Sequence, residues 1–297
     1  MAEHRFLHLT AVLQALLVTF LWSTSWVLIK MGIEDIPALT FAGLRYSLAF
    51  LCLLPLVLRP ALMAPLRRLS RQDWARLVAL GLLFYAVTQG AQFFGLAFLP
   101  SMTVSLLLNF TTIVISMSGI PLLGERPTLL QWCGILLNVA GIVLYFHPVS
   151  FPASQAVALA VVGAGVLANA GSSMLGRRIN RSGDISPLVV TTISMGIGAG
   201  VLFAAGILTQ GLPRLDPVHW AIVGWLAVVN TAFAFTLWNH TLRTLSAVES
   251  SIINSTMLVQ IAVLAWLFLG ERLTLQEGIG MALAGVGALI VQVRRRD

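Results

Sequence analysis

Leu123-Gly124-Glu125-Arg126 recurs 146 positions later in the chain as Leu269-Gly270-Glu271-Arg272. The match extends over residues 123–144, where nine positions are identical to the shifted sequence, Thr128 and Thr274 among them. Shared leucines and glycines are common in apolar helices, but a shared Gly-Glu-Arg is informative because only 10% of the residues are charged. The pattern predicts an internal duplication, and a repeat of this kind governs the whole architecture.

The composition places the rest of the chain in a membrane. Of its 297 residues, 58% are hydrophobic, and the mean hydropathy is +0.91. Globular proteins carry roughly 25% charged residues, so this chain has too few polar groups to cover a water-soluble surface. This excludes soluble enzymes and nucleic-acid binders, and the net charge of +7 is attributed to arginines in cytoplasmic loops.

The apolar segments predict an all-α integral membrane protein with ten transmembrane helices. A helix needs about 20 apolar residues to cross the hydrocarbon. Helices are required because lipid offers no partner to free backbone groups, and the ten-residue alternation of a barrel is absent. Cuts at charges and prolines place the spans near 10–32, 38–58, 75–98, 102–122, 128–146, 153–176, 186–208, 218–241, 246–269 and 274–293.

Each copy of the repeat contains five spans, in residues 1–148 and residues 149–297. Because five is odd, the second copy enters the membrane from the opposite face, and the two halves are inverted. Inverted repeats provide a route to alternating access, since exchanging the conformations of two similar halves moves the opening from one face to the other.

The distribution of Lys and Arg predicts the orientation. With the N-terminus inside, 14 of the 18 basic residues lie on the cytoplasmic side. Only Lys30, Arg214 and Arg272 fall on the outer side, and Arg45 lies within the second span. The positive-inside rule therefore predicts a multi-pass protein of the inner (plasma) membrane with both termini in the cytoplasm.

Three segments resemble the EamA family of the drug/metabolite transporter superfamily. They are Leu21-Trp22-Ser23-Thr24-Ser25-Trp26 leading to Lys30-Met31-Gly32, then residues 37–45, and the paired Leu-Gly-Glu-Arg segments. The resemblance implies a ten-helix inner-membrane carrier, often an exporter of amino acids, other small metabolites or drugs. The chain departs from the family at Thr112 and Leu258, where a proline is frequent, so the resemblance does not carry a broken-helix site over to these positions.

Polar side chains in the third span are candidates for a substrate cavity. Tyr85, Gln89 and Gln92 recur at i, i+4 and i+7, which places them on one face of a helix. The repeat pairs this face with an aromatic one that includes Trp238. Polar groups at membrane depth usually face the bundle interior or a wet cavity. The alternative is that the two amides only join neighbouring helices.

Tryptophans in the first span suggest a second wall of this cavity. Trp22 and Trp26 lie at i and i+4, and the repeat places Asn169 in the corresponding region of the sixth span. Such a pocket would suit an amphipathic ligand with an apolar or cationic part. Anchoring at the membrane interface is an equally weighted alternative.

Further amides and two charges complete the set of candidates. Asn109, Asn230 and Asn254 lie in the fourth, eighth and ninth spans, where joining helices is the alternative to substrate contact. Arg45 is expected to cap carbonyls or to pair with Glu34 or Asp35, with an anionic ligand group as the alternative.

Glu249 is a carboxylate within an apolar run, near the start of the ninth predicted span. Stabilisation of a helix start is favoured over proton coupling, which would need a pKa raised by desolvation. Glu125 and Glu271 are likewise assigned to helix starts and to pairing with the adjacent arginine.

No cofactor or metal site is predicted. The five histidines lack metal-ligand spacing, Cys52 and Cys133 lie in separate spans where packing is expected, and no nucleotide-binding loop is present. Transport is therefore expected to follow a gradient or to be passive, and the chain is not expected to be an enzyme.

The sequence favours a secondary transporter that exports a small amphipathic metabolite, such as an amino acid or a related compound. A multidrug exporter of the same superfamily is the alternative within this class, and a non-transporting membrane interaction subunit is the alternative from another class. Expected partners are the small-molecule substrate and membrane lipid. The glycine-rich fifth and tenth spans are expected at the periphery or against a second copy, which leaves a homodimer open.

Overall fold

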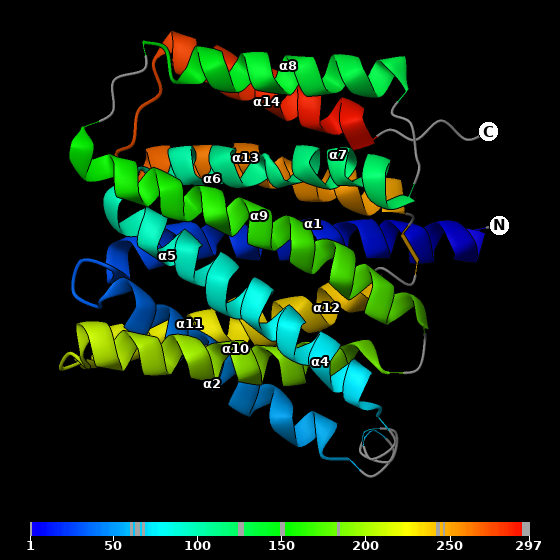
Figure 1. The fold of residues 1–297 in the computed structure, drawn as a ribbon, viewed down its shortest axis with the longest axis vertical. Helices are drawn as coiled ribbons and strands as arrows, with labels where there is room; N and C mark the ends of the chain where they lie inside the picture. The colour runs from blue at the N-terminus through cyan, green and yellow to red at the C-terminus, as the bar shows by residue number, and fades with distance from the viewer. Residues whose placement is uncertain are drawn as a thin grey trace.

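A computed structural model describes residues 2–59, 62, 66, 69–123, 128–148, 152–182, 185–241, 244–245 and 247–292. Every regular element in these ranges is a helix. The helices form one bundle, with the start of α1 and the end of α14 at the same end of it (Figure 1). The all-α architecture expected for a membrane protein is thereby confirmed.

The bounds of the helices follow the predicted spans closely, and two spans contain a π-helical segment. In chain order the elements are α1 (Ala2–Gly32), α2 (Ala38–Val57), α4 (Arg71–Leu80), η1 (Gly81–Thr88), α5 (Gln89–Phe98), α6 (Ser101–Asn109), α7 (Thr111–Leu123), α8 (Leu129–Tyr145), α9 (Ala153–Ser182), α10 (Pro187–Gln210), α11 (Pro217–Ala227), η2 (Val228–Phe233), α12 (Ala234–Thr241), α13 (Ala247–Leu269) and α14 (Leu275–Gln292).

Length and composition identify seven membrane-spanning helices within the described residues. Three shorter apolar helical segments, Ser101–Ile115, Leu129–Tyr145 and Leu275–Val291, occupy the places of the fourth, fifth and tenth predicted spans. The multi-pass character of the chain is clear from these helices. The count of ten spans stays a prediction, because these three are shorter than the usual length of a membrane-crossing helix.

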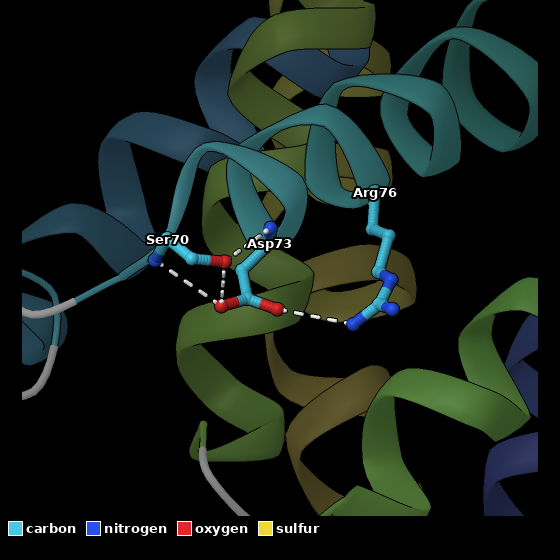
Figure 2. A network of polar contacts seen from close by, with 3 residues as sticks. All are labelled: Ser70, Asp73 and Arg76. Atoms are coloured by element: carbon cyan, nitrogen blue, oxygen red, sulfur yellow. Dashed lines mark hydrogen bonds and ion pairs between the residues drawn. The ribbon is translucent and has the colours of Figure 1, made fainter.

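Reciprocal capping boxes begin several helices. At the start of α4, the Ser70 hydroxyl accepts a hydrogen bond from the Asp73 backbone N–H, and the Asp73 carboxylate accepts one from the Ser70 backbone N–H (Figure 2). Arg76 also donates to this carboxylate, at 3.1 Å. Such a box satisfies two backbone donors that the helix itself leaves free.

The same device begins α8 and α14. Thr128 and Gln131 form a box at the start of α8, and Thr274 and Glu277 form one at the start of α14. These pairs are 146 positions apart, so the threonine shared by the two copies is a helix cap in both.

Two helix pairs lie at opposite edges of the bundle, α8 with α14 and α2 with α10 (Figure 1). In the first pair, a Cβ on Gly280 would lie 2.6 Å from the Tyr145 backbone nitrogen, and one on Gly134 would lie 2.9 Å from the Gly287 carbonyl oxygen. Asn138 Nδ2 donates to the Ala284 carbonyl at 2.6 Å, and these two residues are 146 positions apart. The closest contact of this pair therefore joins residues that the repeat relates.

The interior is polar in places and the surface is largely apolar. Arg45, Gln89 and Asn230 are buried, whereas many leucines, valines and tryptophans are exposed on the outside of the bundle. This distribution suits a helix bundle surrounded by hydrocarbon. Cys52 and Cys133, for which packing was expected, are both free and exposed on the surface of the bundle.

Candidate functional site

Arg45 is a buried cation about two turns into α2. Only 4% of its surface is exposed, and its Nε donates a hydrogen bond to the Thr231 hydroxyl at 3.0 Å. Its guanidinium carbon lies over the rings of Tyr46 and Phe93, 5.2 and 6.0 Å from their centroids. Since Thr231 belongs to η2, this contact joins the first half of the chain to the second.

The two π-helical segments meet α2 at positions that the repeat relates. Tyr85 of η1 packs edge to face against Tyr46, with ring centroids 5.6 Å apart, while Thr231 of η2 accepts from Arg45. Tyr85 and Thr231 are 146 positions apart. π-helical turns are rare in proteins and are frequent at functional sites. Arg45 and Tyr46, which are adjacent in α2, therefore contact Thr231 and Tyr85, two residues that the repeat relates.

Threonine hydroxyls accompany the wide turns of both segments. Thr88 Oγ1 donates to the Leu83 carbonyl at 2.8 Å, and Thr231 Oγ1 donates to the Leu226 carbonyl at 2.8 Å. Each donor lies five residues after its acceptor, as the π-helical geometry requires. These hydroxyls donate to backbone carbonyls within the wide turns of the two segments. The sequence analysis predicted plain helices here.

The expected partners of Arg45 are wrong. Within the described residues no carboxylate lies at ion-pair distance from it, and Thr231 is its hydrogen-bond acceptor. Asp35 instead contacts His219, with Oδ2 and Nε2 3.0 Å apart. Arg45 therefore stabilises neither the outer end of α2 nor a run of helix carbonyls.

The third span, whose Phe93 ring lies under the Arg45 guanidinium, also carries the predicted amide-bearing face. Tyr85 is 3% exposed and Gln89 is 9% exposed, and Gln92 is half-buried. Tyr85 lies in η1, and Gln89 is the first residue of α5. The helix therefore changes from π to α geometry between these two side chains. Within the part of the chain that the structure describes, the side-chain amides of Gln89 and Gln92 form no hydrogen bond.

Aromatic rings from α1 and α12 form a second cluster. Trp22 is half-buried, and its ring centroid lies 5.2 Å from that of Phe235 and 5.2 Å from that of Trp238. The indole Nε1 of Trp22 is buried and lacks a hydrogen-bond partner. Trp26 is buried in the main hydrophobic core, which also contains Tyr85. The two tryptophans of the first span thus have different surroundings.

Asn230 fixes η2 against α1. It is fully buried, and its Nδ2 donates to the Leu21 carbonyl and, at 3.1 Å, to the Thr24 hydroxyl. Its Oδ1 is buried and has no partner. Asn230 and Thr231 are consecutive, so η2 is held by both α1 and α2 of the first half.

The fourth span is interrupted even though it lacks the proline typical of the family. Asn109 ends α6, and α7 begins at Thr111. Asn169 of α9 donates to the Thr111 hydroxyl at 3.2 Å, directly after the interruption. The interruption lies at Phe110, and α7 is continuous through Thr112. In the ninth predicted span, α13 is continuous through Leu258.

The structure does not place the last two candidates, Asn254 and Glu249, with the others. Asn254 is exposed on α13, and the structure gives it no contact with another predicted site residue. Glu249 Oε1 lies 2.8 Å from His8 Nε2, and the two side chains are 40% and 45% exposed. This contact joins α1 to the start of α13, in agreement with the helix-start position assigned to Glu249.

Two charges at the other end of the bundle bind helix ends that are distant in the chain, and sequence reasoning did not identify these partner helices. Glu271 accepts hydrogen bonds from the backbone N–H groups of Ser101 and Met102, at 2.7 and 3.1 Å, and so caps α6 of the other half. Lys30 donates to the carbonyls of Leu96 and Leu99, at 2.6 and 2.9 Å. The repeated Leu-Gly-Glu-Arg segment drew attention to Glu271. It could not identify α6 as the helix that Glu271 caps, because α6 is distant in the chain. Glu125, its counterpart, lies outside the described residues.

An apolar groove of about 340 Å³ opens between α2 and α10. None of the predicted site residues lines it. Its lining is formed by Phe50, Leu54, Val57, Leu58, Leu66, Trp74, Thr192, Ile193, Gly196 and Ile197.

The helix bundle and its buried polar groups define a multi-pass α-helical membrane protein. The model of the EamA-like transporter family matches residues 9–147 and again residues 156–293. The chain belongs to this family, as its motifs predict. The family and the names of its relatives indicate a transporter, which is not an enzyme.

Three curated relatives span most of the chain. An uncharacterized transporter, YoaV of Bacillus subtilis, is 24% identical over 91% of this chain and 92% of its own. An S-adenosylmethionine/S-adenosylhomocysteine transporter of Chlamydia trachomatis is 27% identical over 88% of this chain and 82% of its own. The uncharacterized inner membrane transporter YedA of Escherichia coli is 24% identical over 82% of this chain and 78% of its own.

A solved crystal structure shares the fold. It superposes with a TM-score of 0.69, at 19% sequence identity, and covers 95% of this chain and 97% of that chain. At this identity the likeness concerns the fold alone.

Proposed function

We propose that this protein is a secondary transporter that works by alternating access between two inverted halves, residues 1–148 and residues 149–297. The observation that supports it is the contact of Arg45 with Thr231, which joins α2 of the first half to η2 of the second. The adjacent Tyr46 contacts the equivalent residue of the first half, Tyr85. A substrate bound at this junction would touch both halves at once. Such contact is required if substrate binding is to be coupled to the exchange of conformations between the two halves.

The proposed substrate is a small amphipathic metabolite, such as an amino acid or a related compound. Trp22, Phe235 and Trp238 offer an aromatic surface, and Gln89 and Gln92 offer amides without partners among the described residues. A relative that is named a transporter of S-adenosylmethionine and S-adenosylhomocysteine supports this class of compound. Both compounds combine an aromatic base with an amino acid group.

Export across the inner membrane, with both termini in the cytoplasm, is the proposed direction and placement. The common position of the start of α1 and the end of α14 supports an even number of crossings (Figure 1). The E. coli relative is named an inner membrane transporter. The orientation itself follows from the positive-inside rule.

Flux measurements on reconstituted protein test this function. Gln89→Ala and Trp238→Ala are expected to reduce uptake of transported amino acids into proteoliposomes by about tenfold, because each removes a contact from the proposed substrate path. Val87→Ala and Trp225→Ala are matched controls, since both residues lie in the same spans but are exposed on the bundle surface.

The outcomes separate the alternatives. Unchanged flux in both Gln89→Ala and Trp238→Ala, with folded protein, would remove these residues from the path. Flux of hydrophobic drugs but of no metabolite would favour the multidrug exporter. Absence of flux across the full panel would favour a non-transporting interaction subunit.

A further inference from the structure

The guanidinium of Arg45 has unused hydrogen-bonding capacity. Arginine presents five N–H donors, and here Nε alone donates, to Thr231. Within the described residues, no carboxylate lies close enough to neutralise its charge. The rings of Tyr46 and Phe93 attract the cation but accept no ordinary hydrogen bond. The two terminal nitrogens are therefore left without acceptors among the residues that the structure describes.

Lys30, a cation near the end of the first span, shows how this fold satisfies a charge that serves structure. Its ammonium donates to the carbonyls of Leu96 and Leu99 and thereby caps the end of α5. Arg45 caps nothing, although it is more deeply buried. Placing a charge in a low-dielectric interior is costly unless it is paired, so this guanidinium does not serve stability alone.

The position of Arg45 favours a ligand as the absent partner. Arg45 contacts Thr231 of η2, its neighbour Tyr46 contacts Tyr85 of η1, and its guanidinium lies over Phe93 of α5, the helix that also carries Gln89. A small part of the surface of the residue, 4%, stays accessible. A planar carboxylate is the group that a guanidinium binds best, through two parallel charge-assisted hydrogen bonds.

We propose that Arg45 binds the carboxylate of the transported compound, which makes small carboxylic acids with an apolar or aromatic body the substrate class. This proposal rests on the transport function proposed above. Binding would supply the missing acceptors to the terminal nitrogens while Nε keeps its contact with Thr231. Compounds that lack the carboxylate, such as amines and amides, would leave the buried cation without its counter-charge.

Thermal unfolding of the detergent-purified protein tests this with matched compounds. The probes are L-phenylalanine, L-tryptophan and L-methionine, each compared with its amide. A compound that binds the folded state raises the melting temperature. At least one acid is expected to stabilise the wild type, with about tenfold or more tighter binding than its amide, as the loss of charge-assisted hydrogen bonds implies.

Variants of Arg45 distinguish a binding role from a structural one. Arg45→Met is expected to abolish the preference for the acid while the melting temperature of the ligand-free protein stays the same or rises, because an unpaired buried charge is removed. Arg45→Lys is expected to keep a weakened preference, and it serves as the second variant if Arg45→Met does not fold. Lys30→Met is the matched control and is expected to lower the melting temperature, since it removes a helix cap.

Four results would overturn the proposal. They are equal stabilisation by acids and amides, no stabilisation by any of the three acids, retention of the acid preference in Arg45→Met, and a lowered melting temperature of ligand-free Arg45→Met with acid binding intact. Proteoliposome flux is measured in parallel. Flux of amides or amines without acids refutes the carboxylate site and leaves transport standing, whereas acid binding without any flux supports the site and refutes transport.

Discussion

At the scale of single residues, the few charges within the apolar helices divide by what they contact. Glu271 and Lys30 satisfy backbone groups at helix ends, whereas Arg45 retains donors that the protein does not use. Glu271 is the clearest structural charge, because its two carboxylate oxygens accept the first two N–H groups of α6. A negative charge is also favoured at this position by the helix dipole.

Glu271→Gln is expected to lower stability by about 1 kcal/mol, because the amide has one acceptor oxygen in place of two and no charge. The measurement is the melting temperature of the purified protein. Glu34→Gln is the control, since it makes the same chemical change at an exposed position of the same end of the bundle. An equal effect of the two substitutions would show that net charge, and not the cap of α6, is responsible.

At the scale of elements, helix contacts are close where glycines face backbone. Gly280 of α14 lies against Tyr145 of α8, while Gly278 of the same helix has open space where a Cβ would be. The glycine-rich α14 thus pairs with α8 at one edge of the bundle (Figure 1). Small residues at such contacts let helices approach closely enough to pack without a hydrophobic driving force.

Gly280→Ala is expected to destabilise the protein by about 1–3 kcal/mol, because its Cβ would force the two backbones apart. Gly278→Ala is the matched control, two positions away on the same helix. It is expected to be neutral or slightly stabilising, since alanine favours a helix more than glycine does. Melting temperatures of the two variants check this, and equal values would contradict the close contact of α8 with α14.

At the scale of the whole molecule, the contacts recur with the period of the sequence repeat. Asn138 meets Ala284, its own counterpart, and α2 meets Tyr85 and Thr231, which are counterparts of each other. Contacts of this kind are expected where two similar halves pack around a two-fold axis. Residues equivalent in the repeat then lie at opposite ends of the bundle, as the starts of α8 and α14 do (Figure 1).

Thr128→Cys and Thr274→Cys are therefore expected to react from opposite sides of the membrane. Both positions are exposed and begin equivalent helices. The measurement is labelling of intact cells and of inverted vesicles with a charged maleimide, in a background where Cys52 and Cys133 are replaced by alanine. Labelling of Thr274→Cys in intact cells and of Thr128→Cys in inverted vesicles is expected; reaction of both from one side would refute the inverted arrangement.

Much of the element order was predictable, because each apolar run must form a helix once hydrocarbon excludes water from its backbone. The bounds of α2 and α10 illustrate this, since they follow directly from flanking prolines and charges. The candidate site was predicted less completely. Residue type and helical spacing indicated Gln89, Trp22 and Asn230, but not η1 and η2, which shift the faces on which neighbouring residues lie.

The amino-acid sequence alone determined that this chain is a duplicated helical membrane protein, because hydropathy, scarce charges and the 146-residue repeat are properties of the chain itself. Only the tertiary structure decided which groups the charges meet. Arg45 and Thr231 are 186 positions apart, and Glu271 and Ser101 are 170 apart. No local pattern specifies such pairs, because they depend on how helices from the two halves pack against one another.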